Sequence, residues 1–227
     1  MNFLHTLKAP DVVTLSNALL GLLSIFVAYA GYPDMAFVLI LMAAVADGVD
    51  GYLARSYSGS EIGEFLDSLA DVISFGVAPA TVVFIACGGS MPYMVGAVVC
   101  IYLVCGILRL ARFSTKQKSI PDFEGLPITA AAVVIASYML LDGKYVYTYV
   151  VLAILILLAY LMISEYPYPK LRGPRAMGLV SLLFILTIGS YFLVEQYMYI
   201  FSTTLFLSMM LYLESPIMRV PRRYYED

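Results

Sequence analysis

Four aspartates lie inside two apolar stretches of the sequence, in the segment VADGVDGYLARSYSGSEIGEFLDSLADVISF. Asp47 and Asp50 are three residues apart and Asp67 and Asp71 are four apart, so in helices each pair would share a face. The turn formers in RSYSGSEI predict an antiparallel helix pair in which the four carboxylates converge. Converging anions at low effective dielectric repel each other strongly, and Arg55 is the one arginine in this stretch. Carboxylate oxygens select hard cations, and four of them balance two ions such as Mg²⁺ or Mn²⁺, so a two-cation site is predicted.

Such a pair of cations is typical of phosphoryl chemistry, because the two ions can bridge the attacking and leaving oxygens. Gly51 and Ala54 continue the first acidic face and Gly63 begins the second, so a bulky substrate could approach the helix backbone closely. A divalent-cation transporter is the alternative from a different class. It should carry its acids near the membrane midplane with polar residues leading both ways, whereas the other halves of these segments are almost free of charge.

The elements that must hold these residues are membrane helices. The sequence is 62% hydrophobic and 13% charged, with a mean hydropathy of +0.88, far above the usage of soluble domains. A spanning helix needs about 20 mostly apolar residues. We therefore predict an all-α polytopic membrane bundle of about eight transmembrane helices, at roughly 12–31, 35–56, 64–88, 93–113, 126–142, 146–164, 176–194 and 197–213. We expect one domain over 1–227, with residues 1–10 forming an interfacial helix and no cleavable signal peptide.

The basic residues predict an orientation for this bundle. On the predicted map, one side carries twelve of the thirteen, and Lys144 falls on the other. By the positive-inside rule the first side is cytoplasmic, with both termini and the aspartates at that face of the cytoplasmic membrane. The twelve are Lys8, Arg55, Arg109, Arg112, Lys116, Lys118, Lys170, Arg172, Arg175, Arg219, Arg222 and Arg223.

Other chemistries find little support. Cys87, Cys100 and Cys105 lie in spans without metal-ligand spacing, and His5 is the single histidine, so a Ser–His or Cys–His nucleophilic pair is almost excluded. No Walker loop or dinucleotide glycine pattern is found. We expect no nucleic-acid partner.

The acidic pattern resembles the signature of the CDP-alcohol phosphotransferases. It reads Asp47-x2-Asp50-Gly51-x2-Ala54-Arg55-x7-Gly63-x3-Asp67-x3-Asp71. The family pattern has eight residues between the Arg and the Gly where this sequence has seven. That difference lies in the turn and leaves both acidic faces unchanged. A six-helix core over 12–175 with two additional C-terminal spans, 176–213, is what the resemblance implies.

The resemblance implies a reaction in which an alcohol displaces CMP from a CDP-linked lipid. Asp47, Asp50 and Asp67 would then hold two divalent cations, Mg²⁺ or Mn²⁺, and Asp71 would complete the metal site and act as the general base. Gly51, Ala54, Arg55 and Gly63 would lie along the CDP-lipid. Thr14 and Asn17, in the TLSN stretch of the first span, resemble a polar patch that faces the nucleotide, although bonding between helices explains them equally well.

Two further stretches resemble the serine-using branch of the family, LRLARFSTKQKSIPDFEGLPITAAA and ISEYPYPKLRG. They predict L-serine as the acceptor, with Arg109, Arg112 and Lys170 as candidates for binding its carboxylate or a phosphate, and Glu124 for its ammonium. The positive residues are alternatively ordinary cytoplasmic anchors. Inositol phosphate or glycerol phosphate is the alternative acceptor within the same chemistry.

Several partner assignments stay open at this level. The donor lipid is CDP-diacylglycerol or CDP-archaeol, because an apolar groove would accept ester-linked and ether-linked chains alike. Direct displacement is favoured over a covalent intermediate because no second nucleophile is evident. A homodimer in the lipid membrane is what the resemblance implies.

Overall fold

The computed structural model describes residues 8–56, 60, 62–89, 91–115, 123–168 and 174–218. The all-α prediction is confirmed, because each of the eight predicted apolar segments carries a helix. The elements are α1 (Ala9–Tyr29), α2 (Pro33–Ser56), α3 (Gly63–Asp71), the π-helix η2 (Val72–Val77), α4 (Ala78–Cys87), α5 (Pro92–Thr115), β1 (Phe123–Glu124), α6 (Ile128–Met139), the 3-10 turn η3 (Gly143–Tyr145), α7 (Thr148–Ile163), β2 (Pro167–Tyr168), α8 (Pro174–Leu193) and α9 (Glu195–Met218).

Four helices in the described part of the chain are long and apolar enough to cross a membrane: α1, α2 up to Leu53, the continuous α3–η2–α4 helix, and α5 up to Phe113. The protein is therefore an integral membrane protein. The predicted count of eight spans is only partly met. The apolar helices α6 and α7 have 12 and 16 residues, fewer than the roughly 20 that cross hydrocarbon unaided.

Helix α1 shows how the bilayer inverts the usual amphipathic pattern. Its buried face carries small and polar residues, whereas Leu19, Phe26 and other large apolar side chains point outward and are exposed. In water this would be unstable, but hydrocarbon solvates the apolar face, and small residues let helices approach closely. The approach is close at Gly21, where a Cβ would lie 2.6 Å from the Cα of Ser74. The buried residues of α1 are Pro10, Asp11, Thr14, Asn17, Gly21, Ser24 and Ala28.

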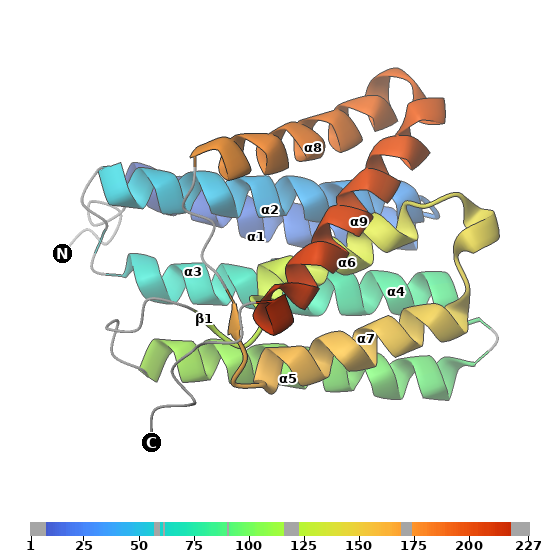
Figure 1. The fold of residues 1–227 in the computed structure, drawn as a ribbon, viewed down its shortest axis with the longest axis horizontal. Coiled ribbons are helices and arrows are strands. Elements are labelled where there is room, and N and C mark those ends of the chain that lie inside the picture. The colour runs from blue at the N-terminus through green and yellow to red at the C-terminus, as the bar shows by residue number, and fades with distance from the viewer. Residues whose placement is uncertain are drawn as a thin grey trace.

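The helices run up and down between two ends of the molecule (Figure 1). At one end lie the turns between α1 and α2, α4 and α5, α6 and α7, and α8 and α9. At the other end α1 begins, α2 ends, α3 begins, and the β1 and β2 segments lie near the α5–α6 and α7–α8 connections. Both acidic stretches belong to this second end, so the helix directions bring them together.

Helix α6 is the centre of the bundle. Ten of its twelve residues are buried, and it contacts α2, α4, α5, α7, α9 and η2. A helix that is apolar all round is expected to be buried on all sides. Its first turn is thereby fixed beside the ends of α2 and α3, where the aspartates lie.

A π-helix follows the last aspartate directly. In η2 the backbone hydrogen bonds span five residues and not four, as between the Ala78 N–H and the Ile73 carbonyl. Side chains also join this region to its neighbours. The Tyr102 hydroxyl donates to the Phe75 carbonyl at 2.8 Å, and the Ser74 hydroxyl donates to the Asn17 carbonyl at 2.8 Å. Short π segments inside helices occur frequently at functional sites. Here the bonds tie the helix that carries Asp71 to α1 and α5.

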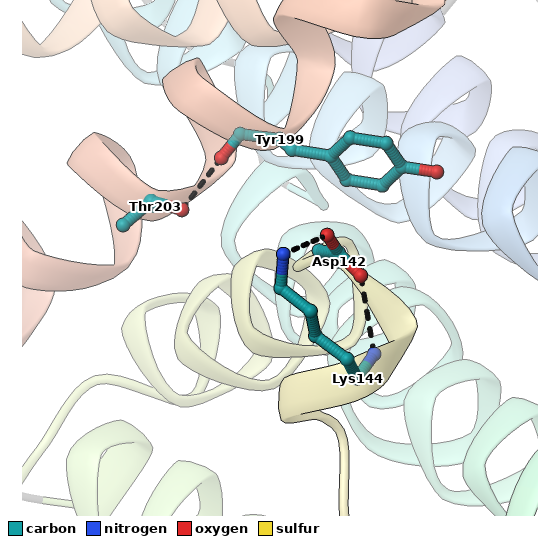
Figure 2. A network of polar contacts seen from close by, with 4 residues as sticks. All are labelled: Asp142, Lys144, Tyr199 and Thr203. Carbon is teal, nitrogen blue, oxygen red and sulfur yellow. Dashed lines mark hydrogen bonds and ion pairs between the residues drawn. The ribbon is translucent and has the colours of Figure 1, made fainter.

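The α6–α7 turn, at the end away from the aspartates, neutralises its own basic residue. Lys144 makes an ion pair with Asp142 at 2.8 Å, and its backbone N–H donates to the same carboxylate at 3.2 Å (Figure 2). These hydrogen bonds hold the pKa of Asp142 below its usual range, so the pair stays ionised. Lys144, the one basic residue predicted to be external, therefore adds no net positive charge to this end.

This arrangement predicts a labelling pattern in a variant without Cys87, Cys100 and Cys105. A membrane-impermeant thiol reagent should reach Glu64→Cys from the cytoplasmic side only. It should reach Tyr32→Cys and Tyr145→Cys, whose parent side chains are 64% and 59% exposed, from the outside only. Labelling in right-side-out and inverted vesicles measures this, and reaction of Glu64→Cys and Tyr145→Cys from the same side would contradict the orientation.

Candidate active site

The predicted acidic pairs converge where α2 and α3 meet. Carboxylate oxygens of Asp47, Asp67 and Asp71 all lie within 4.8 Å of one another. Asp47 comes from the C-terminal half of α2, and the other two share one face of α3 because they are one helical turn apart. This group is able to hold a metal ion.

Asp50 lies next to this group and is 3% exposed. It is within electrostatic range of Asp47 and Asp67. Oδ2 of Asp50 and Oδ1 of Asp71 are buried and have no hydrogen-bond partner among the described residues. A buried carboxylate oxygen without a partner is costly, and an all-oxygen set of this kind suits hard divalent cations. The residues therefore fit the predicted cations.

Thr129, in the first turn of α6, contacts the acidic group as well. Its hydroxyl donates to Oδ2 of Asp47 at 3.3 Å. No local pattern distinguishes Thr129, although it follows the Gly-Leu-Pro segment at the end of the molecule where the aspartates lie. Its position depends on the packing of α6 against α2, which helical periodicity does not predict.

Arg109 brings positive charge to the site from α5. It is 7% exposed and interacts electrostatically with Asp71 and, more weakly, with Asp47. Its guanidinium carbon lies 5.3 Å from the ring centroid of Phe113, one turn further along the helix. A buried arginine requires compensating charge, and the carboxylates supply it. Of the basic side chains predicted to bind an acceptor, Arg109 is the one that the described structure brings to the aspartates.

Helix α1 forms another wall of the site. Thr14 lies beside the Asp50 carboxylate, and its hydroxyl also donates to the Pro10 carbonyl at 3.2 Å. Asn17 is completely buried, and neither polar atom of its amide has a hydrogen-bond partner among the described residues. Leaving a buried amide unsatisfied costs about 1–3 kcal/mol. Asn17 is therefore not explained by bonding between helices.

The two predicted glycines have different surroundings. A Cβ on Gly51 would meet nothing within 4 Å, so α2 has an open surface there. A Cβ on Gly63 would lie 3.3 Å from Oδ1 of Asp11 and 3.2 Å from the Ser60 hydroxyl, which itself donates to Asp11 at 2.9 Å. Gly63 therefore lets the start of α3 pack against α1. The side chains of Ala54 and Arg55, in the last turns of α2, lie outside the described residues.

The two stretches that resemble the serine-using branch meet in space. β1 and β2 pair antiparallel, with Phe123 opposite Tyr168 and Glu124 opposite Pro167. Gly125 then turns the chain with φ +77, and a Cβ there would lie 2.5 Å from the Met162 carbonyl oxygen. These contacts fix the entry into α6. Lys170, predicted to bind an anion, lies outside the described residues.

Arg112 holds this connection together. Its guanidinium donates to the backbone carbonyls of Met162, Ile163 and Ser164, where α7 ends, and of Glu124 in β1, at 2.9–3.4 Å. Helix C-termini leave carbonyls without partners, and basic side chains satisfy them. The described contacts thus give Arg112 and the Glu124 backbone a structural role: they join the end of α7 to β1.

Comparison with known proteins agrees with this geometry. Residues 7–163 match the family model described as CDP-alcohol phosphatidyltransferase. A CDP-diacylglycerol–serine O-phosphatidyltransferase of Helicobacter pylori is 37% identical over 171 residues, 72% of this chain and 72% of its own. An archaetidylserine synthase of Methanothermobacter thermautotrophicus is 39% identical over 170 residues, 74% of this chain and 72% of its own. A CDP-diacylglycerol–serine O-phosphatidyltransferase of Bacillus subtilis is 32% identical over 174 residues, covering 76% of this chain and 96% of its own.

The chain therefore belongs to the CDP-alcohol phosphatidyltransferase family. The resemblance inferred from the spacing of the aspartates is confirmed, and the protein is a transferase. A divalent-cation transporter, the alternative from a different class, has no support from these comparisons.

The contacts of Arg112 predict a stability defect for Arg112→Lys. Lysine keeps the charge but cannot donate to carbonyls from two segments at once, so unfolding should become easier by about 2 kcal/mol, as for the loss of charged hydrogen bonds. Thermal unfolding in detergent measures this, with Lys144→Arg as the matched control at the opposite end. Unchanged stability together with a raised Michaelis constant for the acceptor would instead show that Arg112 binds substrate.

Proposed function

We propose that this protein transfers the phosphatidyl or archaetidyl group of a CDP-linked lipid to the hydroxyl of L-serine and releases CMP. The observation that carries the proposal is the convergence of Asp47, Asp67 and Asp71 with the buried Arg109 beside them. Family membership supports the donor and the reaction class. The printed names of the relatives, which use serine as the acceptor, support the substrate.

Asp47, Asp50, Asp67 and Asp71 would hold two divalent cations, Mg²⁺ or Mn²⁺, which neutralise the carboxylates and polarise the diphosphate when bound. Thr129 orients one of these carboxylates through its hydrogen bond to Asp47. Asp11 and Ser60 fix the start of α3 against α1, so the two acidic helices keep their spacing.

The nucleotide end of the donor fits between α1 and α2. Asn17 offers an amide donor and acceptor, which is what recognition of a pyrimidine edge requires. Thr14, on the same buried face of α1 as Asn17, lies beside Asp50, and the open surface at Gly51 allows close approach to the α2 backbone. Ala54 and Arg55 follow along α2, where the arginine would pair with phosphate. Gly63 contributes indirectly, by the packing of α3.

Asp71 is proposed as the general base. Its Oδ1 would take the proton of the serine hydroxyl while the serine oxygen bonds to the phosphorus that carries the lipid, and the bond from that phosphorus to the CMP oxygen breaks. The guanidinium of Arg109 holds the serine carboxylate nearby. Glu124 is the candidate for the serine ammonium, so the two side chains together would offer both charges that a zwitterion needs. Direct displacement requires no further nucleophile.

Inositol phosphate and glycerol phosphate are the competing acceptors. They are dianionic and should need more than one cationic side chain in the pocket. Of the described arginines, Arg109 lies among the carboxylates and Arg112 is bonded to four carbonyls. This distribution favours serine. Glu124 and Lys170 stay secondary candidates for the same zwitterion.

The membrane topology and the oligomeric state of the enzyme follow the same reasoning. The single domain would span the membrane several times with both termini and the active site at the cytoplasmic face, as the basic residues predict. The exposed apolar faces of α1 and its neighbours would contact lipid, and ester-linked and ether-linked donors remain equally suited to them. A homodimer is part of the proposal because the family resemblance implies one.

The proposed reaction predicts a ranking of acceptors. Purified enzyme with CDP-diacylglycerol or CDP-archaeol should release CMP fastest with L-serine, among serine, glycerol 3-phosphate, inositol 1-phosphate, ethanolamine and choline. Release should stop in excess EDTA and return with Mg²⁺ or Mn²⁺, because the carboxylates need charge balance to admit a diphosphate. Preference for a phosphorylated alcohol would overturn the serine assignment, and full turnover in EDTA would overturn the cation site.

Replacing Asp71 should reduce turnover much more than it reduces the affinity for the CDP-lipid. Asp71→Asn should lose at least about 10²-fold in turnover, as for removal of a general base, while keeping CDP-lipid binding better than Asp47→Asn or Asp50→Asn. A base matters mainly in the transition state. Calorimetric titration with the CDP-lipid, beside the rate of CMP release, measures both. Near-wild-type turnover of Asp71→Asn would exclude it as the base.

A further inference from the structure

Helix α9 packs where β2 lies, although it is outside the family match over 7–163. It crosses the bundle obliquely, and its last turns lie beside β1 and β2 (Figure 1). It contacts α6, α8 and β2. The match to the family model therefore gives no role to α9.

Two tyrosines fasten α9 at this point. Tyr168, on β2, is completely buried, and its ring centroid lies 5.6 Å from that of Tyr212 on α9, with the planes tilted by 40°. Its hydroxyl also donates to the Leu213 carbonyl at 3.4 Å. Pairing of Tyr168 with Phe123 holds β2 in place. The ring of Tyr212 is thus fixed from one side by a rigid neighbour.

Tyr212 is in turn close to Arg109. The phenol of Tyr212 and the guanidinium of Arg109 lie within electrostatic range of each other, and Arg109 is within range of Asp71. Phe113 packs on the guanidinium as well. A long arginine side chain has many rotamers, so walls that restrict it lower the entropic cost of binding an anion in one geometry.

We propose that α9 completes the acceptor subsite, with Tyr212 as a positioning residue that holds the Arg109 guanidinium for the carboxylate of an amino-acid acceptor. Tyr168 maintains Tyr212 in that role. This inference rests on the proposed function and adds a specificity element from outside the family match. It assigns no part in the phosphoryl transfer itself to α9.

The test compares Tyr212→Phe, which keeps the ring and removes the hydroxyl, with Tyr197→Phe, on an exposed position of the same helix. In the full-length enzyme, Tyr212→Phe should raise the Michaelis constant for serine about 3- to 10-fold, the size expected for one polar interaction. The Michaelis constant for the CDP-lipid and the thermal midpoint should stay at the wild-type values, and Tyr197→Phe should change none of these.

A double-mutant cycle shows whether Tyr212 acts through Arg109. Arg109→Lys should raise the serine constant because lysine cannot form the bidentate fork, and adding Tyr212→Phe should cost little more. Additive effects, equal increases for both substrates, or an unchanged serine constant in Tyr212→Phe would each overturn the inference. Tyr168→Phe should also raise the Michaelis constant for serine and not that for the CDP-lipid, by a smaller factor.

Absence of serine-dependent CMP release in the wild type would refute the proposed function instead. The double-mutant cycle would then be measured with the anionic acceptor that the enzyme does use.

Discussion

Mutual repulsion of buried carboxylates is the constraint on which the rest of this structure depends. Asp47, Asp50, Asp67 and Asp71 lie close together at low effective dielectric, where like charges interact far more strongly than in water. The described side chains compensate this repulsion only in part. Arg109 supplies one positive charge and Thr129 one hydrogen bond, while buried oxygens of Asp50 and Asp71 have no partner among the described residues. The fold therefore holds the group in a state that suits bound cations and a diphosphate.

Holding such a group requires rigid supports, and the supports are polar contacts inside an apolar bundle. The small and polar face of α1 packs against α2, α3 and η2, and Ser74 and Tyr102 bond the irregular segment behind Asp71 to its neighbours. In hydrocarbon, every backbone group must be satisfied within the protein. The Tyr102 hydroxyl satisfies one carbonyl of the π-helix in this way, directly after the point where the acidic face ends.

The connection formed by β1 and β2 is fixed by contacts from several helices. Arg112 joins the end of α7 to β1, Gly125 allows the chain to turn against α7, and Tyr168 fastens α9. Two of these contacts join distant segments, since Arg112 and Ser164 are 52 residues apart and Tyr168 and Leu213 are 45 apart. They explain why Arg109 and Arg112, separated by one helical turn, have different surroundings: one faces the carboxylates and the other caps a helix.

The sequence by itself determined the helical class, the eight apolar segments and the faces on which the aspartates lie, because helical periodicity and apolar run length are local properties. Its spacing of acids and glycines also identified the family. Only the tertiary structure decided that α6 and α7 are shorter than a full span, that Gly63 packs against Asp11, that Arg112 caps α7, that Thr129 bonds to Asp47, and that Tyr168 packs on Tyr212. These facts depend on which helices pack together and at what height. That choice follows from the balance of side-chain packing and buried hydrogen bonds between distant segments, which no local pattern records.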